Sequence, residues 1–491
     1  MKHISTSESE ARSERDVVLR WRRLPLLAIL LVVISTFPTR MMGAEMALQI
    51  LHEFFPTNGA PIFPSGRLVE GSDGWFFGAS FRGGDFDSGT VFKVSPHGAV
   101  ITQYSFDGSP YSGPNGWLTH SANGDFYGVA NGYNPDPPGN VFRFRTNGTP
   151  TVEFPWGEPR ESTIRGPLTY DGAGNLYAVT SQGGSNSYTL GLGSVIRITT
   201  NGVSSILFSF NGTNGSAPLS SVVLGNDGNL YGTTAAGGVG FAGSPFTGLG
   251  TVFKSTTNGL LTTLVNFNRT NGAAPYAGLI QGGDGNFYGT TAGGGAFDRG
   301  TVFKMTPDGT LTTLVSFDGI NGAGPGSEVT QGPDGKLYGV TGYGPQNTNS
   351  SYGSFGTVYS ITTNGVLTSV AKFDGTNAQN PLAELCLGND GNLYGLAVDQ
   401  SLRLSLNGNA GIFFRLAQVP QITSLSTTNG TVKLNWTAFT NGIYRVERRS
   451  LLTSGNWTSL VPNVTATSNM ASFVDSTPIA TVGYYRVVLL P

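Results

Sequence analysis

Short apolar runs separated by glycine-rich polar turns follow one another along most of the chain. In residues 277–319 the runs A-G-L-I-Q, N-F-Y-G-T-T, G-T-V-F-K-M-T and T-L-T-T-L-V-S-F alternate with such turns. Runs of this length that are rich in β-branched and aromatic residues are typical of β-strands, and Asp-Gly turns tolerate the positive φ of tight hairpins. The pattern predicts a four-stranded antiparallel unit, whose strands we name a, b, c and d in chain order. It contains no sustained helical periodicity.

The same unit recurs at a nearly constant period. A turn of Asp, Asn or Gly that runs into an aromatic residue and usually a glycine, as in D-G-N-L-Y-G at residues 227–232, occurs seven times. The aromatic residues that anchor the copies lie 50, 50, 54, 57, 50 and 56 residues apart and are Phe77, Tyr127, Tyr177, Tyr231, Tyr288, Tyr338 and Tyr394. Such a period indicates tandem units that cover one another's apolar faces. We predict an all-β fold with a seven-bladed β-propeller over residues 45–417. An open β-solenoid is the alternative, although its rungs usually repeat at roughly 20–30 residues.

The two ends of the repeat region fit this pattern less simply. Eight d-type strands are present for seven blades, because residues 48–55 and 412–416 both resemble this strand, while the expected c strand at residues 401–406 is degenerate. We expect the N-terminal strand to complete the last blade and to clasp the chain ends together. Residues 412–416 would then share that blade or lead into the next domain. After residue 420 the repeat ends, and short alternating strands with Trp436 and a late Tyr-rich strand predict a small β-sandwich over residues 420–491.

The first 44 residues differ from the rest of the chain. Five arginines precede a 14-residue apolar run at residues 24–37, and small residues end at Ala44. This arrangement is typical of a secretory signal peptide, because roughly 20 apolar residues are needed to span a bilayer. We therefore expect residues 1–44 to be removed, the mature chain to be secreted or held at a bacterial cell surface, and no integral membrane segment to remain. A single transmembrane anchor is the alternative.

The composition argues against nucleic acid as a partner and against a disulfide or a metal site. The net charge is −2 for 491 residues, so no polybasic surface is available for nucleic acid. Cys386 is the only cysteine, which excludes an internal disulfide, and it lies in an apolar stretch typical of a buried side chain. None of the three histidines after residue 44 has the spacing of a metal ligand. We expect no cofactor and no metal.

Aligning the a strands places one residue of each repeat at the same level. These residues are Arg67, Trp117, Pro167, Ser221, Gly278, Glu328 and Glu384. The a strands of a propeller line its central channel, so Arg67, Glu328 and Glu384, on blades 1, 6 and 7, are expected to be neighbours. One interpretation is an ion pair between Arg67 and Glu384 that steadies the closure. The other is a polar channel that binds a cation or a sugar hydroxyl, or that uses its two carboxylates as catalytic acids.

Four longer b–c loops carry aromatic side chains. Loops between strands b and c, and connections from strand d to the next strand a, leave an antiparallel sheet at the same end and would share one face of the propeller. Aromatic rings on such loops stack on sugars or anchor protein partners, although some of them would merely pack the loops down. The candidate binding residues are Arg67 and Trp117 at the channel and Tyr133, Tyr188, Phe241, Phe246, Tyr343, Tyr352 and Phe355 on the loops.

The repeat region also resembles a known group of bacterial proteins. The turn N-G-A-x-P at residues 271–275 and 321–325, the strand D-G-N-x-Y-G-T-T at 227–234 and 284–291, and the strand G-T-V-F-K carry the resemblance. The region is similar to the GloVer-type tandem repeats of choice-of-anchor exported proteins, and the C-terminal module resembles fibronectin type III-like domains. The resemblance implies an exported bacterial surface or secreted protein, and it supplies no catalytic residue.

These observations favour a non-catalytic exported propeller that recognises glycan or protein through its loop face. Two alternatives stay open. One is a polysaccharide hydrolase or lyase that uses Glu328 and Glu384 as acids. The other is a structural surface or matrix protein, which low charge and abundant glycine would suit. An acidic pair with raised pKa values in a deep channel would favour the enzyme, whereas a shallow apolar loop face would favour binding.

Overall fold

The computed structural model is an all-β protein whose described residues form strands and no helix. It describes residues 19–22, 46–54, 61–64, 66–108, 111–121, 124–132, 140–145, 151–155, 164–184, 191–200, 202–344, 355–374, 379–381, 383–399, 410–418, 420, 422–428, 431–438, 443–449, 456–468, 470–477 and 482–489. Within these ranges there is no helix with the length and apolar character that a membrane crossing requires. The chain divides into two compact units, one formed by Ala47–Ala417 and the other by Met1–Met46 together with Gln418–Pro491.

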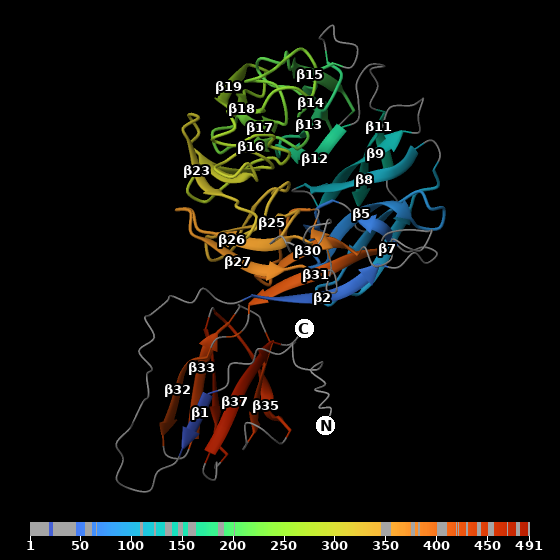
Figure 1. Cartoon of the computed structure of the whole chain (residues 1–491). Helices are drawn as coiled ribbons and strands as arrows, with labels where there is room; N and C mark the ends of the chain where they lie inside the picture. Colours follow the sequence, from blue (N-terminus) through green and yellow to red (C-terminus); the bar gives the residue numbers. More distant parts are fainter. Residues whose placement is uncertain are drawn as a thin grey trace, which may run out of the picture. The chain divides into compact units, whose positions relative to one another are not determined.

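Antiparallel sheets built from successive repeats make up the unit Ala47–Ala417 (Figure 1). Each of the first six sheets takes its strands from one repeat in chain order, so the predicted four-stranded unit is confirmed. The strands of the first six sheets are β3 (Pro61–Pro64), β4 (Val69–Glu70), β5 (Phe76–Gly83), β6 (Thr90–Val94) and β7 (Val100–Ser105); β8 (Tyr111–His120), β9 (Asp125–Gly132), β10 (Asn140–Arg145) and β11 (Thr151–Pro155); β12 (Ile164–Tyr170), β13 (Asn175–Thr180), β14 (Ser194–Thr199) and β15 (Ser204–Ser209); β16 (Val223–Leu224), β17 (Leu230–Thr234), β18 (Thr251–Ser255) and β19 (Leu261–Asn266); β20 (Ile280–Gln281), β21 (Phe287–Thr291), β22 (Thr301–Met305) and β23 (Leu311–Ser316); β24 (Thr330–Gln331), β25 (Leu337–Thr341), β26 (Thr357–Ile361) and β27 (Leu367–Lys372).

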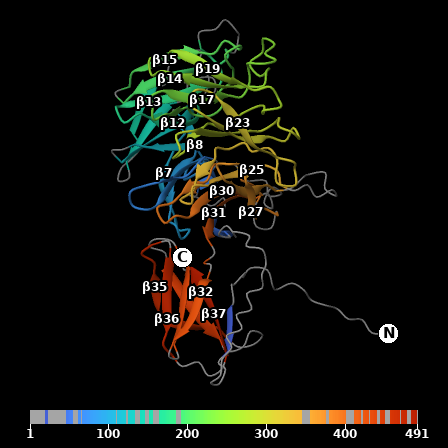
Figure 2. The ribbon, with the colours of Figure 1, turned by 90° about the vertical axis from the view of Figure 1, so that its left-hand side faces the viewer.

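The seventh sheet of this unit joins the two ends of the repeat region. Its strands are β28 (Gln379–Pro381), β29 (Cys386–Leu387), β30 (Leu393–Asp399), β31 (Ala410–Gln418) and β2 (Met46–Phe54). The N-terminal strand β2 pairs with β31 at the outer edge, as expected of a clasp, and β30 and β31 lie together in both views (Figures 1 and 2). Arg415 Nη2 reinforces this pairing by donating a hydrogen bond to Gln49 Oε1 at 2.6 Å.

The third strand of the seventh sheet decides between the two expectations for residues 412–416. They share the last sheet, because they belong to β31, which pairs with β30 on one side and β2 on the other, and they form its third strand instead of a second d strand. Phe413 and Phe414 are fully buried, and a strand covered on both faces carries consecutive apolar residues instead of an alternating pattern. The degenerate c strand expected at residues 401–406 lies outside the described residues.

Neighbouring sheets pack face to face through aromatic pairs. Tyr231 of the fourth sheet stacks on Phe287 of the fifth with ring centroids 4.0 Å apart. The seventh sheet packs on the first in a similar way, since the ring centroids of Tyr394 and Phe76 lie 4.3 Å apart. Such pairs contribute about 0.5–1.5 kcal/mol each beyond the burial of their surface. The last sheet therefore contacts the first, and the sheets have a propeller-like arrangement.

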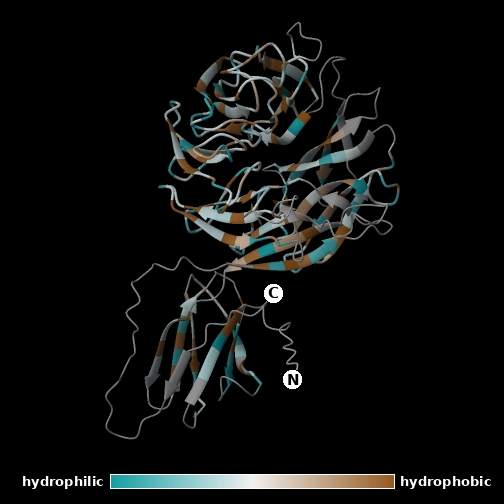
Figure 3. Cartoon of the chain, viewed as in Figure 1, coloured by the Kyte–Doolittle hydropathy of each residue, from teal (hydrophilic) through white to brown (hydrophobic). Residues whose placement is uncertain are grey.

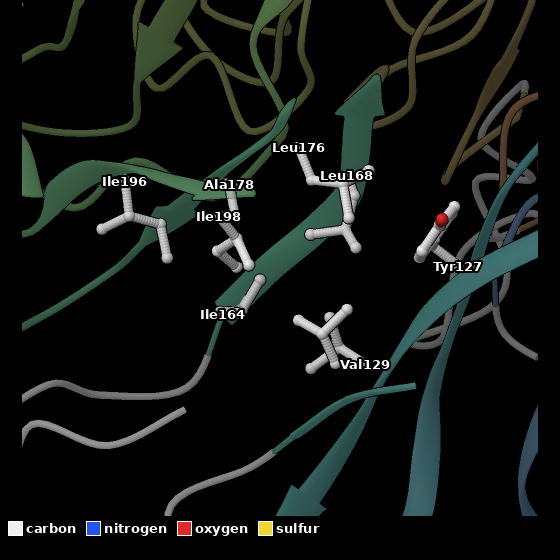
Figure 4. Close-up of a cluster of buried hydrophobic side chains, with 9 residues drawn as sticks. Tyr127, Val129, Ile164, Leu168, Leu176, Ala178, Ile196 and Ile198 are labelled. Atoms are coloured by element: carbon white, nitrogen blue, oxygen red, sulfur yellow. The ribbon is translucent and has the colours of Figure 1, made fainter. Parts of the chain in front are cut away.

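Aliphatic clusters fill the remaining space between sheets. Figure 4 shows one of them, in which Tyr127 and Val129 of β9 lie across from Ile164, Leu168 and Leu176 of β12 and β13. All five side chains are at most 3 % exposed. Brown, hydrophobic segments alternate with white and teal ones along the strands (Figure 3). Because each sheet buries its apolar faces only against its neighbours, a single repeat has no complete core of its own.

The Asp-Gly turn of the repeat is tied to its own sheet by side chains. Asp227 Oδ2 accepts hydrogen bonds from Tyr231 OH at 2.9 Å and from Lys254 Nζ at 2.8 Å. Partial burial alone would raise the pKa of Asp227, but the hydrogen bonds from Lys254, Asn229 and Tyr231 lower it overall. The same set recurs in the next repeat as Asp284, Tyr288 and Lys304. The motifs D-G-N-x-Y-G and T-V-F-K thus recur together in the sequence, because the lysine of the second motif binds the aspartate of the first.

The second unit contains two antiparallel sheets that enclose its own core. Trp436 and Tyr444 are buried there with ring centroids 5.7 Å apart. The strands are β1 (Leu19–Arg22), β37 (Val482–Leu489), β34 (Ile443–Arg449) and β35 (Thr458–Thr465) in one sheet and β32 (Ile422–Thr428), β33 (Thr431–Thr437) and β36 (Met470–Asp475) in the other. Strand β1 pairs with β37 although it lies within the expected signal peptide. Removal of residues 1–44 would remove β1 and leave the sheet that contains it with three strands, β37, β34 and β35.

Candidate functional site

The a strands of the first, sixth and seventh sheets bring three charged side chains to one cavity. Arg67, Glu328 and Glu384 line this cavity, whose volume is about 390 Å³. Arg67 Nη1 lies 3.3 Å from Glu384 Oε1, and the two side chains are 34 % and 11 % exposed. The structure thus places together the three channel residues that the alignment of the repeats had singled out.

Glu328 is the most deeply buried acid of the cavity, with 6 % of its surface exposed. Its Oε1 accepts a hydrogen bond from Ser220 Oγ at 2.9 Å. Gly278 leaves the space that the carboxylate occupies, since a Cβ at that position would lie 2.3 Å from Glu328 Oε1. Burial, together with the negative charge of Glu384, raises the pKa of Glu328 to about 7, although the charge of Arg67 and the hydrogen bonds from Ser220 and the Gly278 backbone oppose the rise. The carboxyl group therefore changes its charge near neutral pH.

The pKa values of Arg67 and Glu70, two other charged groups of the cavity, are shifted for different reasons. Burial lowers the pKa of Arg67, but the charges of Glu384 and Glu328 outweigh this effect and leave the pKa raised. Glu70 lines the same cavity, and its Oε2 accepts a hydrogen bond from the backbone N–H of Asn389 at 2.7 Å. Burial raises the pKa of Glu70 despite this bond. The described lining therefore contains three carboxyl groups and one guanidinium.

The cavity extends from Arg67, Glu328 and Glu384 toward the a–b turns of the sheets. Its lining continues along the a strands to Gln281 and Gln331, which lie just before those turns. Gln281 Oε1 accepts a hydrogen bond from the backbone N–H of Asn226 at 2.8 Å, and Gln331 Oε1 accepts one from that of Gly283 at 2.9 Å. Each glutamine thus binds the turn of the preceding sheet. The a–b and c–d turns lie at one end of an antiparallel sheet and the b–c loops at the other, so the cavity and the loop face are separate places.

Trp117 occupies the same level of the repeat as the charged residues but has a different position. Its side chain is half-buried, and it is not among the described residues that line the cavity. Close by, the a strands of the first two sheets almost touch, because a Cβ on Gly66 would lie 1.9 Å from the carbonyl oxygen of Gly116. Backbone contact at this level leaves room only for glycine. The structure therefore does not bring Trp117 together with Arg67 and the two glutamates.

The aromatic loop residues divide into exposed and packed side chains. Phe246 and Tyr343 are more than half exposed. Phe241 instead packs against the core cluster between the third and fourth sheets, beneath Gly212, and Phe355 is half-buried. The remaining candidates, Tyr133, Tyr188 and Tyr352, lie outside the described residues.

Further exposed apolar residues lie at the same end of the sheets. Phe86 and Phe297 belong to two short b–c loops with the shared sequence G-G-x-F-D, and Tyr276 and Ile320 belong to d–a connections. Sequence reasoning missed them because it weighed only the longer loops. The repeated G-G-x-F-D phrase was the available signal. With Phe246 and Tyr343 they form what we call the loop-face set, which consists of Phe86, Phe246, Tyr276, Phe297, Ile320 and Tyr343.

The two G-G-x-F-D loops hold their phenylalanines in the same fixed geometry. Asp298 Oδ1 accepts a hydrogen bond from the backbone N–H of Gly294 at 3.0 Å, and Asp87 Oδ1 accepts one from that of Gly83 at 2.9 Å. Both aspartates have positive φ, 55° and 51°, a conformation that non-glycine residues rarely adopt. Loops fixed in this way present Phe297 and its equivalent to solvent with little conformational entropy left to lose.

The part of the chain that the structure describes contains no set of side chains arranged to bind a metal ion. No group of three or more His, Cys, Asp or Glu side chains lies close enough there to hold a metal ion. Cys386 lines the cavity, and burial raises the pKa of its thiol to about 12. A thiol with this pKa is not a nucleophile near neutral pH.

Comparisons with known proteins concern the repeat region and the fold. The sequence model of the Gloeobacter/Verrucomicrobia repeat matches residues 39–191 and 166–414. No curated protein matches the chain significantly.

Solved structures to which the chain is similar include the BP39L lectin from Burkholderia pseudomallei, which is 11% identical with a TM-score of 0.43 over 85% of this chain and 99% of the lectin. A gluconolactonase from Xanthomonas campestris is 13% identical with a TM-score of 0.34 over 59% of this chain and 81% of its own. An ulvan lyase of polysaccharide lyase family PL25 is 10% identical with a TM-score of 0.37 over 67% and 84%. At TM-scores below 0.5, nothing about the ligands or reactions of these proteins is carried over to this chain.

Proposed function

The chain belongs to the Gloeobacter/Verrucomicrobia repeat family, and we propose that its repeats form a closed seven-bladed β-propeller that is exported and binds glycan through its loop face. The contact between Tyr394 and Phe76 supports closure, because it joins the last sheet to the first. Strand β2 supports it too, because it completes the last sheet with the N-terminal end of the repeat region. A closed ring of this kind leaves short, protected sheet edges and a rigid face for recognition.

The loop-face set is the single observation that carries the binding proposal. Large apolar side chains that stay exposed on fixed loops are typical of recognition surfaces. Five members of the set are aromatic, and aromatic rings offer flat apolar faces to the C–H face of a sugar ring. Each ring has its own loop with polar residues beside it, such as Asp298 and Arg299 after Phe297 and Thr247 after Phe246, so apolar faces alternate with hydrogen-bonding groups. This alternation matches the surface of a glycan more closely than the contiguous apolar core of a protein interface.

A glycan array probed with residues 45–491 tests the proposal. We expect binding to one class of neutral or weakly charged oligosaccharide, and a Phe297→Ala variant should lose about 5- to 30-fold in affinity. The matched control is Leu260→Ala, because Leu260 is also a large exposed apolar residue but lies in a c–d turn at the opposite end of its sheet. Selective binding to a protein partner, with no glycan retained, would instead support protein recognition by the same face.

A second candidate function follows from the central cavity. Glu328 and Glu384 line it together, and the pKa of Glu328 is raised to about 7, as a general acid requires. A polysaccharide hydrolase or lyase would use the former as proton donor and the latter as the second carboxylate. A degradation screen on polysaccharides tests it. Product formation that disappears in Glu328→Gln would establish catalysis. If no polysaccharide gave a product, glycan binding at the loop face would be the one proposed function left.

Export and the C-terminal module complete the proposal. We infer that residues 1–44 are a signal peptide and that cleavage near Ala44 leaves β2 at the start of the mature chain, ready to complete the last sheet. Residues 420–491 would then form a small fibronectin type III-like sandwich that acts as a spacer or attachment module. The core around Trp436 supports a sandwich, because two sheets enclose it. N-terminal sequencing of the secreted protein tests the cleavage site.

A further inference from the structure

The central cavity is lined by more acidic than basic side chains, and these side chains play no part in the proposed glycan binding at the loop face. Glu70, Glu328 and Glu384 line it, and Arg67 is the one cationic side chain among its described lining residues. The remaining polar lining groups, which include Gln281 and Gln331, are neutral. With all three acids ionised the lining carries an excess of two negative charges. Charges removed from water are costly unless they are paired.

The hydrogen bonds of the three carboxylates show where the excess charge resides. Glu384 is paired with Arg67 at 3.3 Å, yet its Oε1 has no hydrogen-bond donor of good geometry in the described structure. Glu328 receives a hydroxyl donor from Ser220, and Glu70 receives a backbone amide, so both depend on neutral donors. Neutral donors stabilise a carboxylate less than a cation does. Glu70 and Glu328 therefore lack a cationic partner of their own, and Glu384 has an ion pair without a well-formed hydrogen bond, so the cavity can accept a positively charged ligand.

We propose that this cavity binds a small organic cation, one with a primary ammonium group that the carboxylates of Glu328 and Glu384 accept. The volume of about 390 Å³ lies within the range of small-molecule sites. Ile280, Val329 and Leu385 provide apolar lining for an aliphatic portion of the ligand. A metal ion fits less well, because the described acids do not form a group of three around one point.

This site is independent of glycan binding at the loop face. The cavity lies along the a strands toward the a–b turns, whereas the loop-face set lies at the opposite end of the sheets. The excess negative charge also disfavours acidic sugars such as uronates in the cavity, since like charges repel strongly where water is excluded. Loss of one site should therefore leave the other unaffected, and the two proposals can fail separately.

Calorimetric titration of the full chain with 1,4-diaminobutane at about pH 8, where Glu328 is ionised, tests the proposal. We expect one diamine per chain, and no measurable binding of 1,4-butanediol, which has the same length without the charges. Glu384→Gln should weaken binding about 10-fold or more by removing one acceptor of the ammonium group. Glu53→Gln, an exposed acid on β2, serves as the matched control and should change the affinity less than about twofold. Phe297→Ala should bind the diamine normally.

Proton release supplies a readout that a purely structural role of Glu328 would not move. The charged groups around this acid are Arg67, Glu70 and Glu384, with the thiol of Cys386 also on the cavity lining. At about pH 6 the incoming cation should displace a proton from Glu328, so the observed binding enthalpy should vary with the ionisation enthalpy of the buffer. In Glu328→Gln that dependence should vanish. Equal binding of the diamine and the diol, absence of diamine binding, or equal affinities in wild type and both cavity variants would overturn the proposal.

Discussion

Replacing Glu328 with glutamine removes one titrating group from the central cavity while keeping the side-chain length and an oxygen for the Ser220 hydroxyl. In the folded protein the carboxyl has a pKa of about 7, against 4.5 ordinarily. A folded-state pKa that is raised means that the folded protein binds this proton more tightly than the unfolded chain does. The stability that results is present below pH 4.5 and is lost as the pH rises through about 7.

The size of this effect follows from the pKa difference. Each pKa unit corresponds to about 1.4 kcal/mol, so the rise from 4.5 to about 7 amounts to roughly 3 kcal/mol. Because part of the transition lies below pH 5, wild type should lose about 2 kcal/mol relative to the Glu328→Gln variant between about pH 5 and pH 8. The variant should therefore gain relative stability in neutral and alkaline solution.

Urea unfolding followed by tryptophan fluorescence at about pH 5 and pH 8 measures this difference. Other acids titrate in the same range, so the quantity of interest is the free energy of unfolding of wild type minus that of the variant at each pH. Glu53→Gln, whose carboxyl is exposed, should show the wild-type dependence on pH. If the difference between wild type and Glu328→Gln were the same at both pH values, the reasoning about a buried proton in the cavity would be refuted.

Three further predictions concern the fold and the loop face. Deleting β2 should lower Tm by more than 10 °C, because the last sheet loses its edge strand and the buried Phe54, and loss of a buried phenylalanine alone costs about 3–5 kcal/mol; an unchanged Tm would contradict the clasp. Tyr231→Phe should cost about 1 kcal/mol in urea unfolding by removing the hydrogen bond to Asp227, and Tyr231→Ala about 3–5 kcal/mol by removing the stack on Phe287, so equal costs would refute this division. Phe297→Ala should reduce glycan affinity without changing Tm, and a fall in Tm would mean that the ring packs instead of binding.

The repeat pattern predicted the sheets because one signal was copied seven times. Turn residues, β-branched runs and the aromatic anchor agree in the first six copies, so a local pattern determines a local unit there. The same alignment placed Arg67 and Glu384 at one level, and closure of the sheets brings them within 3.3 Å. At the seventh sheet the pattern failed, because β31 is buried on both faces and so resembles a d strand in sequence although it occupies the third position.

The exposure of loop aromatics could not be predicted from the sequence. Phe241 and Phe246 lie five residues apart in one loop, yet Phe241 packs beneath Gly212 and Phe246 faces solvent. The difference depends on a glycine in the preceding connection, which leaves space for one ring and not for the other. The contacts between Asp227 and Tyr231 were missed for a related reason, since the turn already had a sufficient explanation in its hairpin geometry.

We propose that rings on the loop face, and not acids in the cavity, contact the glycan. A crystal structure of the chain with the oligosaccharide selected on the array distinguishes these two positions. We expect a sugar ring stacked on Phe297 or Tyr343, with the loops of the free protein unchanged. A sugar bound between Glu328 and Glu384 in the central cavity, with the loop face empty, would contradict it.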